Sequence, residues 1–140
     1  MMRHSIGAAF ALATAFAAAS AQACAVHEPL NLRSALSADL VVTGRIVNYR
    51  TDARRNEVVD IAVSEVLRGR AGRLVTVDFS GRMLGPPGAL PRGPVLAALQ
   101  RNGGGYVILW HICSDPFLLR AGSANAVATR RLLRQPLNRR

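Results

Sequence analysis

Residues 38–49 place the strongest constraint on the fold, because their side chains alternate with the period of a β-strand. Leu40, Val42, Gly44 and Ile46 fall on one side, and the residues between them are mixed in polarity. A period of two indicates a strand with one buried face. A glycine within such a strand permits the bulge or sharp coil that a small closed sheet requires. The segments that follow are therefore expected to pair with this strand.

Four later segments also show strand patterns, and glycine, proline or polar residues separate them. In the second strand the alternation slips at Glu65-Val66-Leu67, which indicates a bulge or the curl of the strand into the next turn. Both sides of the last strand are largely apolar, so we expect it to be central in the sheet or covered on its outside by the C-terminal helix. Residues 80–94 contain closely spaced glycines and prolines and predict one long irregular loop. The expected later strands are residues 57–67, 74–79, 95–99 and 106–113.

Helices are expected at both ends of the strand region. The first lies within residues 28–38 and is capped by Asn31, and the second follows Ser123 and ends at about Gln135. A mainly β chain of five strands with a short helix before them and a helix after them is typical of an oligonucleotide/oligosaccharide-binding (OB) type of β-barrel. We therefore expect one OB-like barrel domain over residues 24–136 and a basic tail over residues 137–140.

Residues 1–23 have the organisation of a secretory signal peptide. Arg3 gives a positive start, residues 6–19 are apolar and rich in alanine, and Ala21-Gln22-Ala23 ends the segment. This order predicts cleavage after Ala23 and export to the periplasm or the medium. The apolar run is shorter than the roughly 20 residues that span a bilayer, and a retained membrane anchor is the alternative. No transmembrane segment is expected after cleavage.

The chain has two cysteines, Cys24 and Cys113, and Cys24 would begin the processed protein. In an oxidising compartment such a pair predicts a disulfide bond. One alternative is lipidation of Cys24, as in bacterial lipoproteins, although the preceding residues lack the usual large aliphatic side chain at the third place before the cysteine. Another is a zinc site formed by Cys24, His27, His111 and Cys113, whose side chains are of the type that zinc prefers. We expect the disulfide, and no bound metal or cofactor.

Arginine dominates the charge of the chain. There are eighteen arginines, no lysine and eight acidic residues, which gives a formal net charge of +10. A cationic surface attracts phosphates, anionic glycans and acidic lipid headgroups. Arginine without lysine, beside abundant alanine, is also what a GC-rich genome produces, so the charge alone does not assign a ligand. Groups of arginines occur within residues 54–55, 68–73 and 130–134.

The start of the processed chain, Cys24-Ala-Val-His-Glu-Pro, is followed by Ser37-Ala-Asp-Leu-Val-Val-Thr-Gly-Arg-Ile-Val47. Together these segments resemble the beginning of netrin-like domains, in particular the tissue inhibitors of metalloproteinases. The segment Glu65-Val-Leu-Arg-Gly69 is similar to the end of the second strand in bacterial members of this superfamily. The resemblance implies a netrin-like barrel of the OB type.

The same resemblance implies a mechanism of inhibition. In those inhibitors the α-amine and carbonyl of the first cysteine chelate the zinc of a protease, so Cys24 would be the chelator and Cys113 its bridge partner. Ala25 would then point toward the specificity pocket of the protease. The chain departs from the inhibitors at Val26, where they carry a second cysteine, and it has at most one disulfide where they have several.

The sequence lacks the motifs of common enzyme classes. It contains no Gly-x-Ser-x-Gly, no phosphate-binding loop and no His-Glu-x-x-His. The acidic residues Asp39, Asp60, Glu65 and Asp78 are interpreted as solvated or strand-edge charges. We therefore expect a binding domain and not an enzyme.

In OB-type barrels the loops that join the first two and the last two strands frame the ligand-binding face. Those loops predict Arg50, Arg54, Arg55 and Arg101 as contacts to an anionic ligand. The expected partner is an anionic glycan, a lipid headgroup or an acidic protein. The alternative partner is a zinc protease, inhibited through the N-terminal cysteine.

Nucleic acid is not an expected partner. Export removes most nucleic acid from reach, and aromatic stacking surfaces are few, since only Tyr49 and Tyr106 are candidates for exposed rings.

Overall fold

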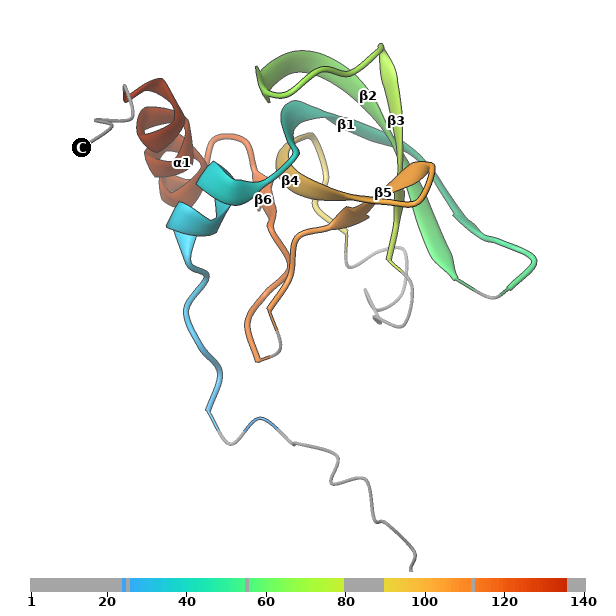
Figure 1. Cartoon of the computed structure of the whole chain (residues 1–140), viewed down its shortest axis with the longest axis horizontal. Helices are drawn as coiled ribbons and strands as arrows, with labels where there is room; N and C mark the ends of the chain where they lie inside the picture. The colour runs from blue at the N-terminus through green and yellow to red at the C-terminus, as the bar shows by residue number, and fades with distance from the viewer. Residues whose placement is uncertain (1–23, 25, 55, 80–89, 112, 136–140) are drawn as a thin grey trace, which may run out of the picture.

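The computed structural model describes residues 24–135 apart from Ala25, Arg55, residues 80–89 and Ile112 (Figure 1). The expected signal peptide, the basic tail and most of the long irregular loop lie outside the described residues. The elements are a 3₁₀ helix η1 (Leu32–Ser37), the strands β1 (Leu40–Thr51), β2 (Glu57–Arg68), β3 (Leu74–Asp78), β4 (Pro94–Asn102), β5 (Gly105–Ile108) and β6 (Leu118–Arg120), and the helix α1 (Ala124–Arg134).

Among the described residues, five strands close into a barrel in the order β1-β2-β3-β5-β4, and pairing between β1 and β4 completes the ring. The β3–β5 pair is parallel, and the other pairs are antiparallel. The short strand β6 pairs with the first part of β4, outside the ring. The fold is mainly β with a C-terminal helix, so the expected small OB-like barrel is confirmed.

The barrel is strongly staggered. Pairing partners lead from Tyr49 of β1 to Val59, Val77, Tyr106 and finally Arg101 of β4. The backbone N–H of Arg101 donates to Oδ2 of Asp39 at 2.8 Å, just before β1 begins. The series of paired residues thus starts at Tyr49, near the end of β1, and ends beside Asp39, just before β1 begins. This offset along β1 is the shear that a closed barrel of tilted strands requires.

Bulges in the β1–β2 pair allow both strands to curve around the barrel. The register shifts between Val41 and Val42, between Thr43 and Gly44, and between Ile46 and Asn48. At Gly44 an added Cβ would lie 2.1 Å from the carbonyl oxygen of Ala62, so only glycine fits this close approach. The bulges expected in both strands are confirmed.

Two apolar clusters share the strands β1 and β4. Leu40, Val42, Ala97 and Leu99 point into the barrel together with Phe79, whereas the residues that alternate with them point outward. The outward cluster lies between the barrel and the helices, and its buried members are Ala35, Ala38, Val41, Leu96, Ala98, Leu109, Phe117 and Ala126. Because both faces of β4 are covered, residues Val95 to Leu99 are all fully buried.

The two helices pack together on the outward cluster (Figure 1). Asn31 caps η1 by accepting from the N–H of Arg33 at 3.1 Å, and Ser123 caps α1 by accepting from the N–H of Ala126 at 3.2 Å. Both expected caps are confirmed. The C-terminal helix α1 contacts η1, β2 and β6, and its Ala126 belongs to the outward cluster together with Leu109, which follows β5.

The last strand of the barrel is shorter than the sequence pattern predicts. β5 ends at Ile108, although the next residue, Leu109, still donates its N–H to the carbonyl oxygen of Ala98 in β4 at 2.9 Å. A turn follows, in which Cys113 adopts a left-handed backbone with φ of 73° and Ser114 donates its N–H to the His111 carbonyl. Leu109 belongs to the outward cluster and Trp110 packs against the cluster inside the barrel, so this segment meets apolar surroundings on both sides.

No helix in the described part of the chain is long and apolar enough to cross a membrane.

Candidate functional site

The predicted contacts Arg50 and Arg54 lie on the β1–β2 hairpin, and Arg55 lies outside the described residues. Arg50 is engaged within the chain, because its guanidinium forms an ion pair with Asp60. Arg54 is exposed, and its backbone N–H donates to Oδ1 of Asp52 at 2.8 Å. The hairpin therefore holds Arg50 against the barrel and presents Arg54 to solvent.

Asp60 departs from the interpretation as a solvated charge, because its side chain is buried on the outer face of β2. It accepts hydrogen bonds from the side chains of Arg50, Thr76 and Asn48, the last two at 2.7 and 3.2 Å. The bond from Arg50 is the largest cause that lowers the pKa of Asp60, and the Thr76 hydroxyl also lowers it. This network ties β1, β2 and β3 together, and a buried carboxylate held by three donors is a structural group.

Arg101 lies away from the hairpin arginines along β1. Its backbone donates to Asp39, before the first residue of β1, whereas Arg50 belongs to the last part of that strand. Its neighbours in space are the β2–β3 loop and the β4–β5 turn, since Gly69 approaches the carbonyl of Asp39 and Arg101 pairs with Tyr106. The groups that could act together with Arg101 are therefore those of the β2–β3 loop.

A pocket of about 340 Å³ opens at this point between β3 and β5. The two strands pair only at Val77–Tyr106 and Asp78–Val107, and they separate toward the beginning of β3. One wall is formed by the β2–β3 loop and the start of β3, and the other by the β4–β5 turn. The lining residues are Arg70, Ala71, Gly72, Leu74, Val75, Thr76, Gly104, Gly105 and Tyr106.

Three arginines lie in or beside this opening. Arg70 lines the pocket, Arg73 lies between two lining residues, and Arg101 pairs with the lining residue Tyr106. Within the described part of the chain, none of the three forms an ion pair with an acidic side chain, whereas Arg50 and Arg130 are paired with Asp60 and Glu65. Guanidinium groups without acidic partners remain available for an external anion.

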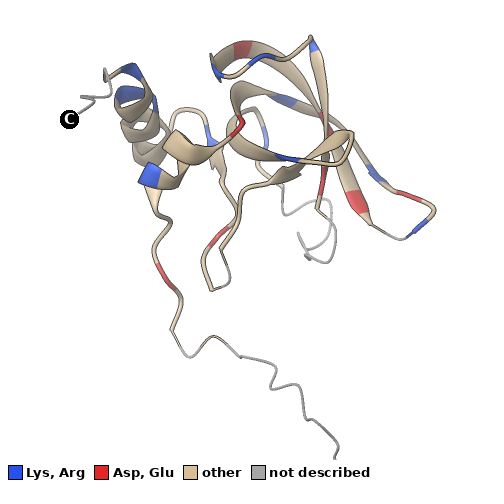
Figure 2. Ribbon diagram, in the orientation of Figure 1, with Lys and Arg blue, Asp and Glu red and all other residues tan. Residues whose placement is uncertain are grey.

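Figure 2 shows that the arginines are distributed over the whole molecule and do not gather in one stripe. The opening combines a pocket with three flanking arginines, whereas a pocket of about 380 Å³ at the end of β1 is lined by Arg92 alone among the arginines. The wall formed by the β4–β5 turn carries no side chains at Gly104 and Gly105. Neither residue has a positive φ, and a Cβ added at either would meet no other atom within 4 Å. Internal packing therefore does not require glycine at these two positions.

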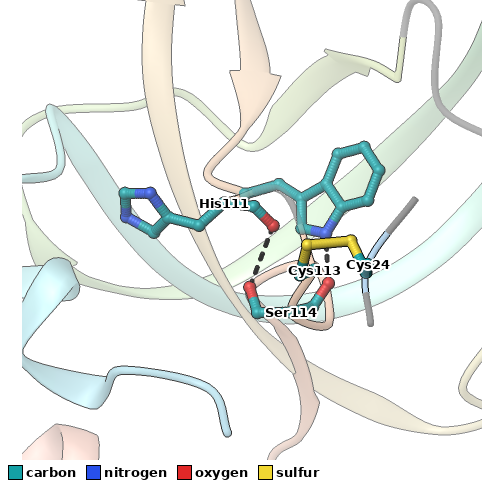
Figure 3. Close-up of a disulfide and its surroundings, with 5 residues drawn as sticks. Cys24, His111, Cys113 and Ser114 are labelled. Carbon is teal, nitrogen blue, oxygen red and sulfur yellow. Dashed lines mark hydrogen bonds between the residues drawn. A yellow bond between two sulfur atoms is a disulfide. The ribbon is translucent and has the colours of Figure 1, made fainter. Parts of the chain in front are cut away.

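The surroundings of Cys24 form a second candidate site. Cys24 and Cys113 are joined by a disulfide with a Cα–Cα distance of 5.2 Å, as the sequence predicts (Figure 3). Nearby, the backbone N–H of Glu28 donates to the carbonyl oxygen of Cys113 at 2.8 Å. The indole N–H of Trp110 donates to the carbonyl oxygen of Ser114. These contacts fix the N-terminal segment to the rim of the barrel.

The disulfide rules out the two alternative roles of the cysteines. A thiol in a disulfide neither carries a lipid nor binds zinc, and the imidazole of His111 points away from the sulfur atoms (Figure 3). His27 lies 3.4 Å from the carboxylate of Asp115, with both side chains mostly exposed. Within the described residues, no group of three or more His, Cys, Asp or Glu side chains is arranged to hold a metal ion.

No protein-family model matches the chain, and no curated protein matches its sequence. The resemblance to netrin-like domains stays a prediction based on the quoted segments.

The sequence indicated the arginine-rich β2–β3 loop but did not single it out as part of a site. The signal that points to it is spatial, because the β3–β5 pairing ends after two residue pairs and leaves the loop beside the β4–β5 turn.

Proposed function

We propose that the chain is an exported, non-enzymatic binding domain that holds an anionic ligand at the opening between β3 and β5. The observation that carries this proposal is a pocket flanked by Arg70, Arg73 and Arg101, none of which has an acidic partner among the described residues. Of the four arginines that the sequence predicts as ligand contacts, Arg101 remains part of the proposed site. Arg50 contributes to the network of Asp60, so its loop is a weaker candidate.

The charge around the opening is favourable to anions. Two acidic groups contact residues of the opening, and both are engaged: Oδ2 of Asp39 accepts the backbone N–H of Arg101, and Asp60, which is paired with Arg50, accepts from the lining residue Thr76. A carboxylate, sulfate or phosphate in the opening would have the guanidinium groups of Arg70, Arg73 and Arg101 as partners. The ligand classes that fit are an anionic glycan, a lipid headgroup and an acidic protein.

The double variant Arg70→Ala/Arg73→Ala tests the site. We expect it to bind a heparin fragment, phosphatidylglycerol vesicles or an acidic polypeptide about tenfold more weakly, because each exposed ion pair contributes about 0.2 to 1 kcal/mol. Binding of the unmodified protein should also fall steeply with added salt. Titration over a series of salt concentrations measures both effects.

The matched control is Arg131→Ala/Arg134→Ala, which removes the same charge from the exposed end of α1. This control should keep nearly the binding of the unmodified protein. Equal weakening in both double variants would mean that only net charge matters, and binding that does not change with salt would contradict an anion site.

Inhibition of a zinc protease is a second candidate, favoured by the exposed terminus. Cys24 and Val26 are exposed beside the disulfide, and Val26 has 74% of its surface accessible. An α-amine on Cys24 would titrate at a pKa of about 7.7 to 8.0, so part of it is unprotonated at neutral pH and could bind a metal.

Adding one alanine before Cys24 tests this second candidate. The addition moves the α-amine away from the disulfide, so any inhibition of a zinc protease by the chain that starts at Cys24 should disappear. Residual protease activity is the measurement, and an alanine added at the C-terminus is the control. Inhibition that survives the N-terminal addition would contradict chelation by this residue.

A further inference from the structure

The backbone of β3 alternates between its two neighbours. Val63 donates its N–H to the carbonyl of Arg73 and Phe79 donates to the carbonyl of Glu57, both at 2.8 Å. In an antiparallel pair, residues that face the partner strand alternate with residues that face away from it. The odd-numbered residues of β3 therefore bond to β2, and the backbone groups of Leu74 and Thr76 point toward the β5 side.

On that side the pairing with β5 includes only Val77 and Asp78. In a parallel pair the residues on either side of a bridged residue make the bonds, so the carbonyl of Thr76 belongs to the Val77–Tyr106 bridge. The N–H and C=O groups of Leu74 and the N–H of Thr76 come before that bridge and face the pocket between the two strands. The Leu74 side chain is 56% exposed beside them, although Leu74 begins a strand of the barrel. An exposed apolar side chain next to a free strand edge is the usual surface for an added strand.

The arginines define what such a strand should carry. Arg70 and Arg73 precede the free edge, and Arg101 lies across the opening beside Tyr106. Side chains of an added strand alternate between its two faces. Acidic residues at every second position would therefore contact the arginines, and the apolar residues between them would contact Leu74. A glycan or a lipid headgroup has no backbone that repeats at this spacing.

We infer that the opening between β3 and β5 binds an extended acidic segment of another protein, which adds to the edge of β3 at Leu74 and Thr76 while its carboxylates contact Arg70, Arg73 and Arg101. This inference rests on the proposed function and names the partner class of the same site. The free edge is short, so affinity depends on the arginines as well as on the backbone.

The probes are a short peptide of alternating glutamate and valine, the same peptide N-methylated at every second residue, and a heparin fragment. We expect the unmethylated peptide to bind and to slow hydrogen exchange at the amides of Leu74 and Thr76. N-methylation should weaken it about tenfold or more, because it removes the backbone donors without changing the charge. Amide exchange and peptide titration, both followed by NMR, are the measurements.

A pair of variants tests the same contact from the side of the protein. Leu74→Pro removes one backbone donor at the first residue of β3, a position where proline is tolerated, and Leu74→Ala keeps the donor while removing the side chain. The proline variant should bind the peptide more weakly than the alanine variant. Thermal unfolding of each variant first establishes that it is folded.

The outcomes separate the two proposals. Equal binding of the methylated and unmethylated peptides, or no change in exchange at Leu74 and Thr76, would overturn strand addition. Binding of the heparin fragment alone would overturn it as well and leave the anion site standing. Binding of none of the three probes would overturn both.

Discussion

Replacing Cys113 with serine is expected to lower the free energy of unfolding by about 4 to 5 kcal/mol. The disulfide joins residues 89 positions apart, and the loop that it closes contains β1 to β5. A cross-link over such a distance removes many conformations from the unfolded chain, and a domain of this size has little stability to spare. Unfolding in urea, followed by the fluorescence of Trp110, measures the change.

Cys24→Ser and the double variant Cys24→Ser/Cys113→Ser serve as controls, because each loses the same cross-link. All three should unfold at the same urea concentration, as should the unmodified protein after reduction. If the loss is under about 1 kcal/mol, the unfolded chain already holds its ends together and the entropic argument fails.

The variant Phe117→Ala is expected to lose about 3 to 5 kcal/mol of stability. Phe117 is fully buried in the outward cluster, where its side chain packs between the barrel and the helices. Its backbone is held independently, since its N–H donates to Leu109 at 2.9 Å and its carbonyl accepts from Ala98 at 3.1 Å. The site is therefore unable to collapse fully, and truncation leaves a cavity. Urea unfolding monitored by circular dichroism measures the loss.

Phe79→Ala provides the comparison, because Phe79 is equally buried but belongs to the cluster inside the barrel. Both variants should lower the midpoint of one cooperative transition without changing its slope, since β1 and β4 contribute to both clusters. A separate early transition of α1 in Phe117→Ala would show that the two clusters unfold independently. Leu74→Ala, at an exposed position, should change stability by no more than about 0.5 kcal/mol.

The sequence predicted the barrel because its local patterns agree with the final structure. Leu40 and Val42 alternate as a half-buried strand should, the slip before Arg68 marks a true bulge, and Asn31 and Ser123 are chemically suited to cap helices. It misplaced the end of β5 because Leu109 and Trp110 look like strand residues when read alone. Leu109 packs in the outward cluster and Trp110 packs against the cluster inside the barrel, and periodicity does not report such contacts between segments.

The site was predicted less well than the fold. Charge along the sequence gives no sign that Arg50 is engaged by Asp60, ten residues later, or that Arg101 lies near Gly69 and not near Arg54. The first fact depends on the register of the β1–β2 hairpin, and the second depends on the stagger of the closed barrel, which only the complete set of strand pairs determines. The disulfide was easier to predict from the sequence than the arginine site, because two cysteines allow one intramolecular pairing.

The position of β4 in the chain has a consequence for how the protein assembles. β1 and β2 are neighbours in sequence and can form a hairpin at once, but β1 reaches its second partner only when Pro94–Asn102 becomes available. Until then both apolar sides of Leu40, Val41 and Val42 are uncovered. We therefore expect the pairing of β4 with β1 to be the slow step of folding, and the unpaired β1–β2 hairpin to be the species most prone to associate with another copy of itself.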